Sequence, residues 1–309
     1  MIHLCNLKNL WIKLRAFTTA TMIQPLQKDD ALLADIASVA DDDERLHVWW
    51  LGQSGFLLKQ AGSCLLLDPY LSDSLTKKYA ESDKPHVRMT ERCVAPEKLT
   101  GIKRVTAGHI HTDHLDAETL VPLAHANGGI QLILPHPILA EAKQRLGDAP
   151  IEYIGLDDGE WTNDDEWEII GIAAAHNDLK RDEQGRCHYL GYVISRNGFI
   201  LYHSSDTLWH EGLLKSLAPH SLDLVLLPIN GNKLERRISG NLNGTEAAAL
   251  AKACAARLVV PCHYDMFTFN TETPEEFVTV CERLGQPYKV MQCGERLTLA
   301  AKEWWRNKD

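Results

Sequence analysis

The chain has 309 residues, of which 45% are hydrophobic and 24% are charged, and its formal net charge is −10. These values are ordinary for a globular protein and leave room for one large domain or two modest ones. The negative charge argues against nucleic acid and anionic membrane surfaces as partners, because both bind clustered lysine and arginine.

The cysteines and the lengths of the apolar runs indicate in which cellular compartment the protein is expected. The eight cysteines form no C-x-x-C pair and no compact framework, so we expect reduced thiols in a cytoplasmic protein. No apolar run approaches the roughly 18 residues that a membrane-spanning helix requires, and we therefore expect no membrane segment.

The first 28 residues differ in charge from the rest of the chain. They carry four cationic side chains and no acidic one, and Asp29 and Asp30 then begin an acidic segment. This shift predicts an N-terminal extension over residues 1–28, as would arise if translation starts at Met22, and a single domain over residues 29–309. A targeting segment is the alternative, although lysine and arginine interrupt any apolar core there.

The first half of the chain is expected to open with strands. A helix near residues 29–40 precedes a β-hairpin with strands over 46–51 and 56–58, and a third strand follows over 64–67. The next expected elements are a strand over 105–108, helices over 117–126 and 137–146, and strands over 130–134 and 167–175.

The dipeptide Asn197-Gly198 is the strongest turn signal, because it readily supplies the two positive φ angles of a type I′ hairpin turn. It predicts a hairpin between the apolar runs at 192–194 and 199–202. The elements expected after it are helices near 210–217, 245–256 and 274–284, and strands near 222–227, 257–260, 288–291 and 296–299. Hairpins followed by alternating helices and strands in both halves favour a four-layer α/β sandwich of two mixed sheets in one domain.

A string of the form H-x-H-x-D-H places four metal-ligating side chains within six positions, namely His109, His111, Asp113 and His114. One ion cannot usefully take all four from so short a loop, which points to two ions. If the strand before the motif continues into it, the first two histidines project to the same side and can share one ion. The last two residues follow as the chain turns into a helix with Asp116 as its N-cap, and they can face a second ion.

Each ion still needs further protein ligands, and three strand ends supply candidates. His176 ends the strand over 167–175, Asp206 follows the Asn-Gly hairpin, and His263 follows a short apolar strand. Imidazole nitrogen and carboxylate oxygen suit Zn²⁺, which is the leading candidate, as well as Mn²⁺ and Fe²⁺. We therefore expect two divalent metal ions per chain.

At this point the sequence resembles the metallo-β-lactamase superfamily, whose H-x-H-x-D-H motif is followed in the same order by a His, an Asp and a His at strand ends. Within it, the chain looks most like the L-ascorbate-6-phosphate lactonase (UlaG-like) family. The similar segments are Trp49–Gly52, His109–Asp116, Tyr202–Asp206 and Val259–Asp265, and the resemblance covers roughly residues 45 to 300. It implies a metallo-β-lactamase-like αβ/βα sandwich, and the chain departs from the lactonase pattern at Tyr264, where a second histidine can stand.

The resemblance also implies metal-assisted hydrolysis, in which two cations lower the pKa of a bridging water enough to hold hydroxide at neutral pH. On this basis one metal is assigned His109, His111 and His176, the other is assigned Asp113, His114 and His263, and Asp206 bridges them. Asp113 is the expected catalytic residue, as the proton acceptor during attack.

Further residues are predicted around the ligands. Asp68, His203 and Asp265 are candidates to support the ligand side chains from behind. Positive charge is concentrated after a strand at Lys233, Arg236 and Arg237, which could bind a phosphate or carboxylate. His188 lies in a second loop that could border the site. The other histidines, such as His47, His86, His125, His136, His210 and His220, are expected to pack or to lie at the surface.

Three functions remain open at this stage. The first is a dinuclear hydrolase that opens the lactone of a small anionic molecule, with a phosphorylated sugar lactone as the leading substrate. The second is a phosphodiesterase acting on a small nucleotide or a phospholipid head group, and the third is a non-catalytic metal-binding module. The resemblance also implies a homo-oligomer. A diiron electron-transfer protein is not expected, because it needs a carboxylate where this chain has His111.

Overall fold

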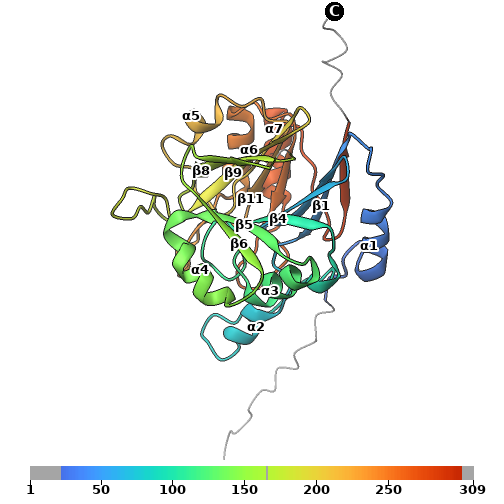
Figure 1. Ribbon diagram of the computed structural model, residues 1–309. Helices are drawn as coiled ribbons and strands as arrows, with labels where there is room; N and C mark the ends of the chain where they lie inside the picture. Colours follow the sequence, from blue (N-terminus) through green and yellow to red (C-terminus); the bar gives the residue numbers. More distant parts are fainter. Residues whose placement is uncertain (1–21, 165, 301–309) are drawn as a thin grey trace, which may run out of the picture.

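Two β-sheets packed face to face form the centre of the fold, and helices cover their outer faces (Figure 1). The computed structural model describes residues 22–164 and 166–300. Across the first sheet the strands are β13 (Arg296–Leu299), β1 (Leu46–Gly52), β2 (Gly55–Gln60), β3 (Ser63–Leu67), β4 (Ile102–Thr106), β5 (Ile130–Pro135) and β6 (Ile151–Leu156). Across the second they are β12 (Val259–Cys262), β11 (Leu224–Pro228), β10 (Phe199–His203), β9 (Leu190–Arg196), β8 (Glu168–Ala173) and β7 (Trp161–Asn163).

Both sheets are mixed, as the sequence predicts. Strand β1 runs antiparallel to its neighbours, whereas β3 to β6 run parallel to one another. In the second sheet β10 to β12 are parallel and β7 to β10 are antiparallel. The predicted four-layer metallo-β-lactamase-like sandwich is therefore confirmed.

The helices form the two outer layers (Figure 1). Those beside the first sheet are α1 (Asp29–Ala37), α2 (Ser74–Lys78), α3 (Ala117–Ala126) and α4 (Leu139–Leu146), and those beside the second are α5 (Leu213–Leu217), α6 (Gly244–Ala253) and α7 (Glu275–Leu284). Short 3-10 turns occur at η1 (Pro96–Lys98), η2 (His136–Ile138) and η3 (Leu234–Arg236). No described helix has the length and apolar character needed to cross a membrane.

Strand β1 explains how an uninterrupted apolar run can serve two layers. Val48 and Trp50 pack into the cluster between the sheets, whereas Trp49 and Leu51 pack with the outer helices. Successive side chains of a strand point to opposite faces, so a strand that is buried on both faces needs apolar residues at every position.

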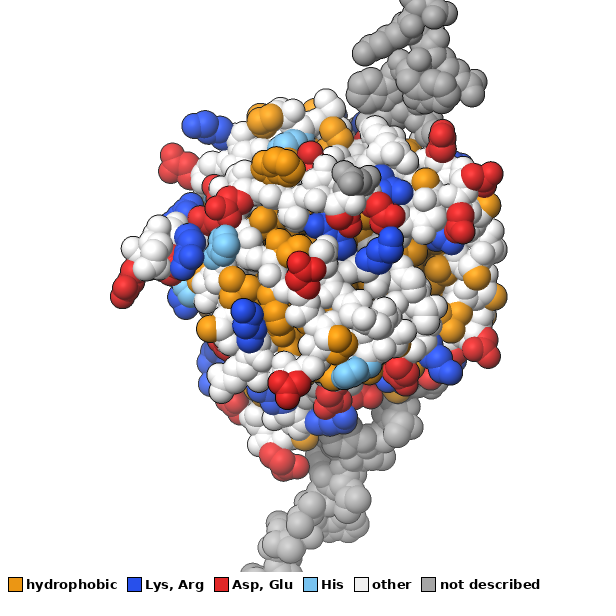
Figure 2. Space-filling model, viewed as in Figure 1, with side chains coloured by type: hydrophobic (Ala, Val, Ile, Leu, Met, Phe, Trp, Pro, Cys, Tyr) orange, Lys and Arg blue, Asp and Glu red, His pale blue; other side chains and the backbone are white. Residues whose placement is uncertain are grey.

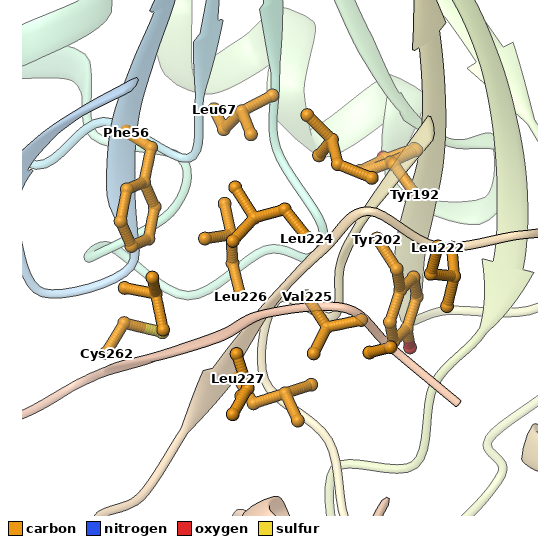
Figure 3. Close-up of a cluster of buried hydrophobic side chains, with 14 of the residues drawn as sticks. Phe56, Leu67, Tyr192, Tyr202, Leu222, Leu224, Val225, Leu226, Leu227 and Cys262 are labelled. Carbon is orange, nitrogen blue, oxygen red and sulfur yellow. The ribbon is translucent and has the colours of Figure 1, made fainter. Parts of the chain in front are cut away.

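Strand β11 repeats this alternation in the second sheet (Figure 3). Leu224 and Leu226 lie on the side of Phe56, which comes from the first sheet, whereas Leu227 lies on the opposite side of the strand. Burying such side chains stabilises the fold by roughly 1.5–3 kcal/mol each. The rigid core that results holds the loops at the ends of the strands in fixed positions.

The predicted Asn-Gly turn is confirmed between β9 and β10, with φ of 43° at Asn197 and 83° at Gly198. The expected strand over 288–291 is wrong, because only an isolated bridge between Tyr288 and Val259 forms there. Strands β6 and β7 and helix α2 had no clear signal, since polar residues interrupt their short apolar runs. The described cysteines are free and, except for Cys254, buried.

Part of the expected N-terminal extension lies against the domain. The backbone N–H of Ile23 donates to Met89 O at 2.8 Å, and that of Leu26 donates to Cys293 O at 2.7 Å. Residues 22–28 are therefore fastened to the loops that carry Met89 and Cys293 before α1 begins. Residues 1–21 of the expected extension lie outside the described residues.

The surface of the molecule carries charges of both signs (Figure 2). On the face shown, acidic and basic side chains are interspersed, and hydrophobic side chains lie between them in small groups.

Candidate metal centre

The H-x-H-x-D-H string lies on the loop between β4 and α3. The strand ends at Thr106, and the backbone bends through residues 108–111. The expectation that the first two histidines leave an extended strand is therefore wrong, although both still reach the same group. Gly108 is required at this bend, because a Cβ there would lie 2.1 Å from Ser205 Oγ. Asp116 caps α3 as predicted, its carboxylate accepting from the N–H of Glu118.

The first ligand group consists of His109, His111 and His176, which each offer one nitrogen, and these nitrogens all lie within 4.8 Å of one another. The ring of His176 is held from behind, with Nδ1 3.0 Å from Gly240 O and 3.1 Å from Asn241 Oδ1. A proton on Nδ1 therefore leaves the Nε2 lone pair free to face the other histidines.

The second group consists of Asp113, His114, Asp206 and His263, whose ligand atoms also lie within 4.8 Å of one another. Asp206 Oδ1 is 3.3 Å from His114 Nε2, and Asp206 Oδ2 is 3.5 Å from His263 Nε2. Asp206 Oδ2 is also 3.7 Å from Nε2 of His176, which belongs to the first group. One carboxylate therefore contacts both groups, in the position predicted for the bridge.

The donor atoms of these groups fit divalent cations. Both ring nitrogens of His109 are buried without a hydrogen-bond partner among the described residues, and His114 Nε2 and Asp206 Oδ1, although 3.3 Å apart, make no hydrogen bond there either. Leaving such an atom unpaired costs about 1–3 kcal/mol, and buried polar atoms that converge without partners call for a ligand. Nitrogen and carboxylate donors without cysteine suit Zn²⁺, Mn²⁺ or Fe²⁺.

The charges of the two groups differ. Burial lowers the pKa of His176 to about 4 and holds the pKa of His109 well below its ordinary value, so the first group offers neutral imidazoles. Burial also lowers the pKa of His263, but Asp206 and Asp113 outweigh it and raise that pKa to about 9. The second group is therefore the one in which carboxylates dominate and attract positive charge.

Asp68 supports the second group from behind, as predicted. Its Oδ2 is 2.7 Å from His114 Nδ1 and accepts from the N–H of Gly108 at 3.1 Å. It also accepts from Ser205 Oγ at 2.6 Å, and its Oδ1 accepts from Thr106 Oγ1 at 2.8 Å. These bonds fix the His114 ring with Nε2 toward the ligand group.

The other two predicted supporting residues act differently. His203 Nδ1 is 4.0 Å from Asp68 Oδ1, and its Nε2 is 3.0 Å from Ser54 O, so the ring borders Asp68. Among the described residues, no hydrogen bond joins the His203 ring to a ligand residue. The backbone of Asp265 binds Thr271 and Thr90. No hydrogen bond joins the Asp265 carboxylate to a ligand among the described residues, and this residue shapes the loop after β12.

A cavity of about 670 Å³ opens onto both groups. Besides ligand residues, its lining includes Leu75, Lys78, Tyr79, Lys84, His86, Arg145, Arg237 and Asn270. Arg237 is thus where the sequence predicts a substrate-binding cation. His86, which we expected to pack or to lie at the surface, also lines the cavity. Neither α2, which ends at Lys78, nor the segment after it gave a signal that Lys78 and Lys84 would do so.

The remaining predicted substrate residues lie elsewhere. Lys233 and Arg236 both pair with Glu272, and neither lines the cavity. Arg236 is further occupied by the backbone oxygens of Asn230 and Thr271. His188 is also absent from the lining, and its backbone N–H donates to Lys180 O. Of the four residues predicted to bind substrate, only Arg237 therefore lines the cavity.

Sequence comparison places these features in a family context. Residues 64–264 match a family model described as the beta-lactamase superfamily domain. The chain is similar to a UPF0173 metal-dependent hydrolase from Opitutus terrae, with 28% identity over 254 residues that cover 82% of this chain and 99% of the relative. A UPF0173 metal-dependent hydrolase from Pyrococcus furiosus is 26% identical over 260 residues, which cover 82% of this chain and 100% of the relative.

Solved structures share the fold. An isothiocyanate hydrolase from Delia radicum gut bacteria has a TM-score of 0.64 and 20% identity, covering 81% of this chain and 98% of that one. Igni18, a metallo hydrolase from Ignicoccus hospitalis, has a TM-score of 0.61 and 21% identity, covering 84% of this chain and 100% of that one. At these identities the similarity concerns the fold alone.

Proposed function

This chain belongs to the beta-lactamase superfamily and is a metal-dependent hydrolase, and we propose that it holds two divalent ions and opens the lactone ring of a small anionic substrate. The observation that carries the two-ion proposal is the position of Asp206, whose carboxylate oxygens lie 3.3 Å from His114 Nε2 and 3.7 Å from His176 Nε2. A single side chain in contact with both ligand groups is the arrangement expected of a bridging ligand. The leading substrate is a phosphorylated sugar lactone.

When bound, a pair of divalent ions supplies a water that ionises near neutral pH and an electrophile for the substrate carbonyl. Within the protein, Asp113 is the residue to which we assign the proton of the attacking water. Its side chain is 15% exposed and lines the cavity, so it can reach both solvent and substrate. Asp68 and Asn241 hold the imidazoles of His114 and His176 in the orientation that ligation requires.

The charge of the cavity supports an anionic substrate. Lys78, Lys84 and Arg237 line it in a protein whose net charge is −10. Lys78 makes no ion pair with any described residue, whereas Arg237 is paired with Asp83 at the rim. Positive side chains around the opening would concentrate and orient a phosphate or carboxylate.

The test measures metal content and reaction products together. Elemental analysis of the purified protein is expected to find two divalent ions per chain, and a panel of phosphorylated and carboxylated lactones is expected to yield one new carboxylate per turnover. A new phosphomonoester from a diester panel would instead identify a phosphodiesterase. Two bound ions without turnover of either panel would indicate a non-catalytic metal-binding module.

A further inference from the structure

Gln53 joins the turn between β1 and β2 to the second ligand group. The residue is 1% exposed and adopts a φ of 50°, in the left-handed region that non-glycine residues rarely occupy. Its backbone oxygen accepts from the N–H of His263 at 3.0 Å and from Trp50 Nε1 at 3.0 Å. The turn is therefore fastened directly to the loop that carries His263.

The side chain of Gln53 reaches the same group. Its Nε2 donates to Asp113 Oδ2 at 2.9 Å and lies 2.9 Å from His263 Nε2. Its Oε1 is buried and has no hydrogen-bond partner among the described residues. The amide thus contacts two of the four residues that could hold one ion, and it occupies the nitrogen of His263 that faces the other ligand atoms.

A purely structural turn would not need this amide. A left-handed backbone at a non-glycine residue costs on the order of 1–3 kcal/mol, and an unpaired buried carbonyl costs about as much again. Glycines at positions 52 and 55 flank the residue and already allow the tight turn. A strained backbone and an unpaired Oε1, at a residue whose Nε2 contacts a ligand group, indicate a function for the side chain.

We propose that Gln53 is a positioning residue that sets the metal affinity of the second group and leaves the first group unaffected. This inference rests on the proposed two-ion function. The amide donates to Asp113 Oδ2, which lies 3.8 Å from His114 Nε2 and 3.6 Å from His263 Nε2, and it thereby fixes the carboxylate oxygen that faces the other ligand atoms. His263 Nε2 would hold an ion in place of its contact with the Gln53 amide, and the hydrogen bond from that amide to Asp113 would remain.

The test is a metal titration of protein freed of ions by chelation, with Zn²⁺ and Mn²⁺ as the probes and calorimetry and elemental analysis as the readouts. Gln53→Leu is expected to lower the affinity for one of the two ions by about tenfold to 100-fold, which is the usual effect of removing a residue that orients a ligand. Repeating the substitution in a His111→Ala background, where only the second group is intact, assigns the weakened ion to that group. Gln53→Glu keeps the length of the side chain but lacks the N–H that donates to Asp113 Oδ2, so it is not expected to recover the affinity.

Gln60 provides a matched control. It is a buried glutamine on β2 whose Nε2 donates to Glu44 O and whose Oε1 also lacks a partner among the described residues. Gln60→Leu should leave both affinities unchanged. If leucine at position 53 impairs folding, Gln53→Met, which keeps the chain length without the amide, gives the same readout.

Two outcomes separate the inference from the function on which it rests. If the wild type binds two ions and folded Gln53→Leu and Gln53→Met bind both as tightly, the inference is overturned and the proposed function stands. If the wild type binds fewer than two ions at saturating metal, the proposed function itself is contradicted.

Discussion

Asp68 Oδ2 lies 2.7 Å from His114 Nδ1, and both side chains are inaccessible to solvent. The carboxylate also accepts from the N–H of Gly108, on the loop that carries the first histidines, and from Ser205, on the loop that carries Asp206. A single buried side chain therefore sets the orientation of one ligand and the spacing of two ligand-bearing loops.

Replacing this carboxylate should weaken metal binding more than it weakens the fold. Asp68→Asn keeps the shape but replaces one of the two oxygens that together accept from His114, Gly108, Ser205 and Thr106, and we expect metal affinity to fall by about tenfold to 100-fold. Equilibrium dialysis with elemental analysis measures this change. Asp73→Asn, an exposed carboxylate that pairs with Arg88, is the control and should bind metal normally. Equal metal affinity in Asp68→Asn and the wild type would contradict the prediction.

Gly108 should tolerate no side chain. A Cβ there would lie 2.1 Å from Ser205 Oγ and 2.6 Å from the backbone oxygen of Leu190, which cannot swing aside as a flexible side chain can. We expect Gly108→Ala to destabilise the protein by about 3 kcal/mol, as overpacking of a buried site does. Gly185→Ala is the comparison, because it has a positive φ but open space around it and should lose only about 1 kcal/mol. Urea unfolding measures both, and similar losses would contradict the steric argument.

The sequence predicts the ligand set because metal ligation needs a few chemically distinctive side chains. Four of them adjoin one another in the chain, and His176, Asp206 and His263 each follow a recognisable apolar strand. These ligand side chains, which are far apart in the sequence, then come together because the strand ends meet at one edge of the sandwich. The same reasoning placed the type I′ hairpin at Asn197, since that local signal does not depend on tertiary context.

The residues that sequence reasoning missed have no such chemical signature. Gln53 and Ser205 are neutral polar residues in turns, where they commonly have no partner beyond the backbone. Lys78 lines the cavity only because α2 folds over the site. Conversely, Lys233 was a reasonable candidate by charge, but its pairing with Glu272 depends on a distant segment. Contacts between loops that are far apart in the sequence cannot be predicted from hydrophobic periodicity or amino-acid composition.

Lys78 should contribute to substrate binding and not to the chemical step. Lys78→Ala removes a cavity-lining cation and is expected to raise KM for an anionic lactone by about tenfold, with kcat and the KM of a neutral lactone little changed. Lys77→Ala removes the adjacent cation, which pairs with Glu118 and does not line the cavity, and should leave KM unchanged. An equal rise in KM for the anionic and neutral substrates would count against charge recognition.

Asp43 should make stability depend on pH at the acidic end. Hydrogen bonds from Arg45, with a smaller contribution from His47, hold the pKa of the Asp43 carboxyl well below its ordinary value in the folded protein. A group whose pKa is lowered by folding stabilises above its unfolded pKa, near 3.9, and this stabilisation is lost as the pH falls toward the folded pKa. Because Arg45 is largely exposed, screening limits the effect to about 1 kcal/mol. Urea unfolding of Asp43→Asn should show this deficit at pH 7 and a smaller one below pH 4 or so, and a deficit independent of pH would contradict the assignment.

Asp206 should matter to both ions, whereas His111 should matter to one. Asp206 contacts the second group through His114 and His263 and the first group through His176, so Asp206→Ala removes a donor from both. His111 belongs to the first group alone. Elemental analysis after dialysis against limiting metal is therefore expected to find about two ions in the wild type, about one in His111→Ala and close to none in Asp206→Ala. His125→Ala, an exposed histidine in the last turn of α3, should retain the wild-type content. Retention of one full ion by Asp206→Ala would mean that this carboxylate serves a single site, and the two-ion proposal would then lose the observation that carries it.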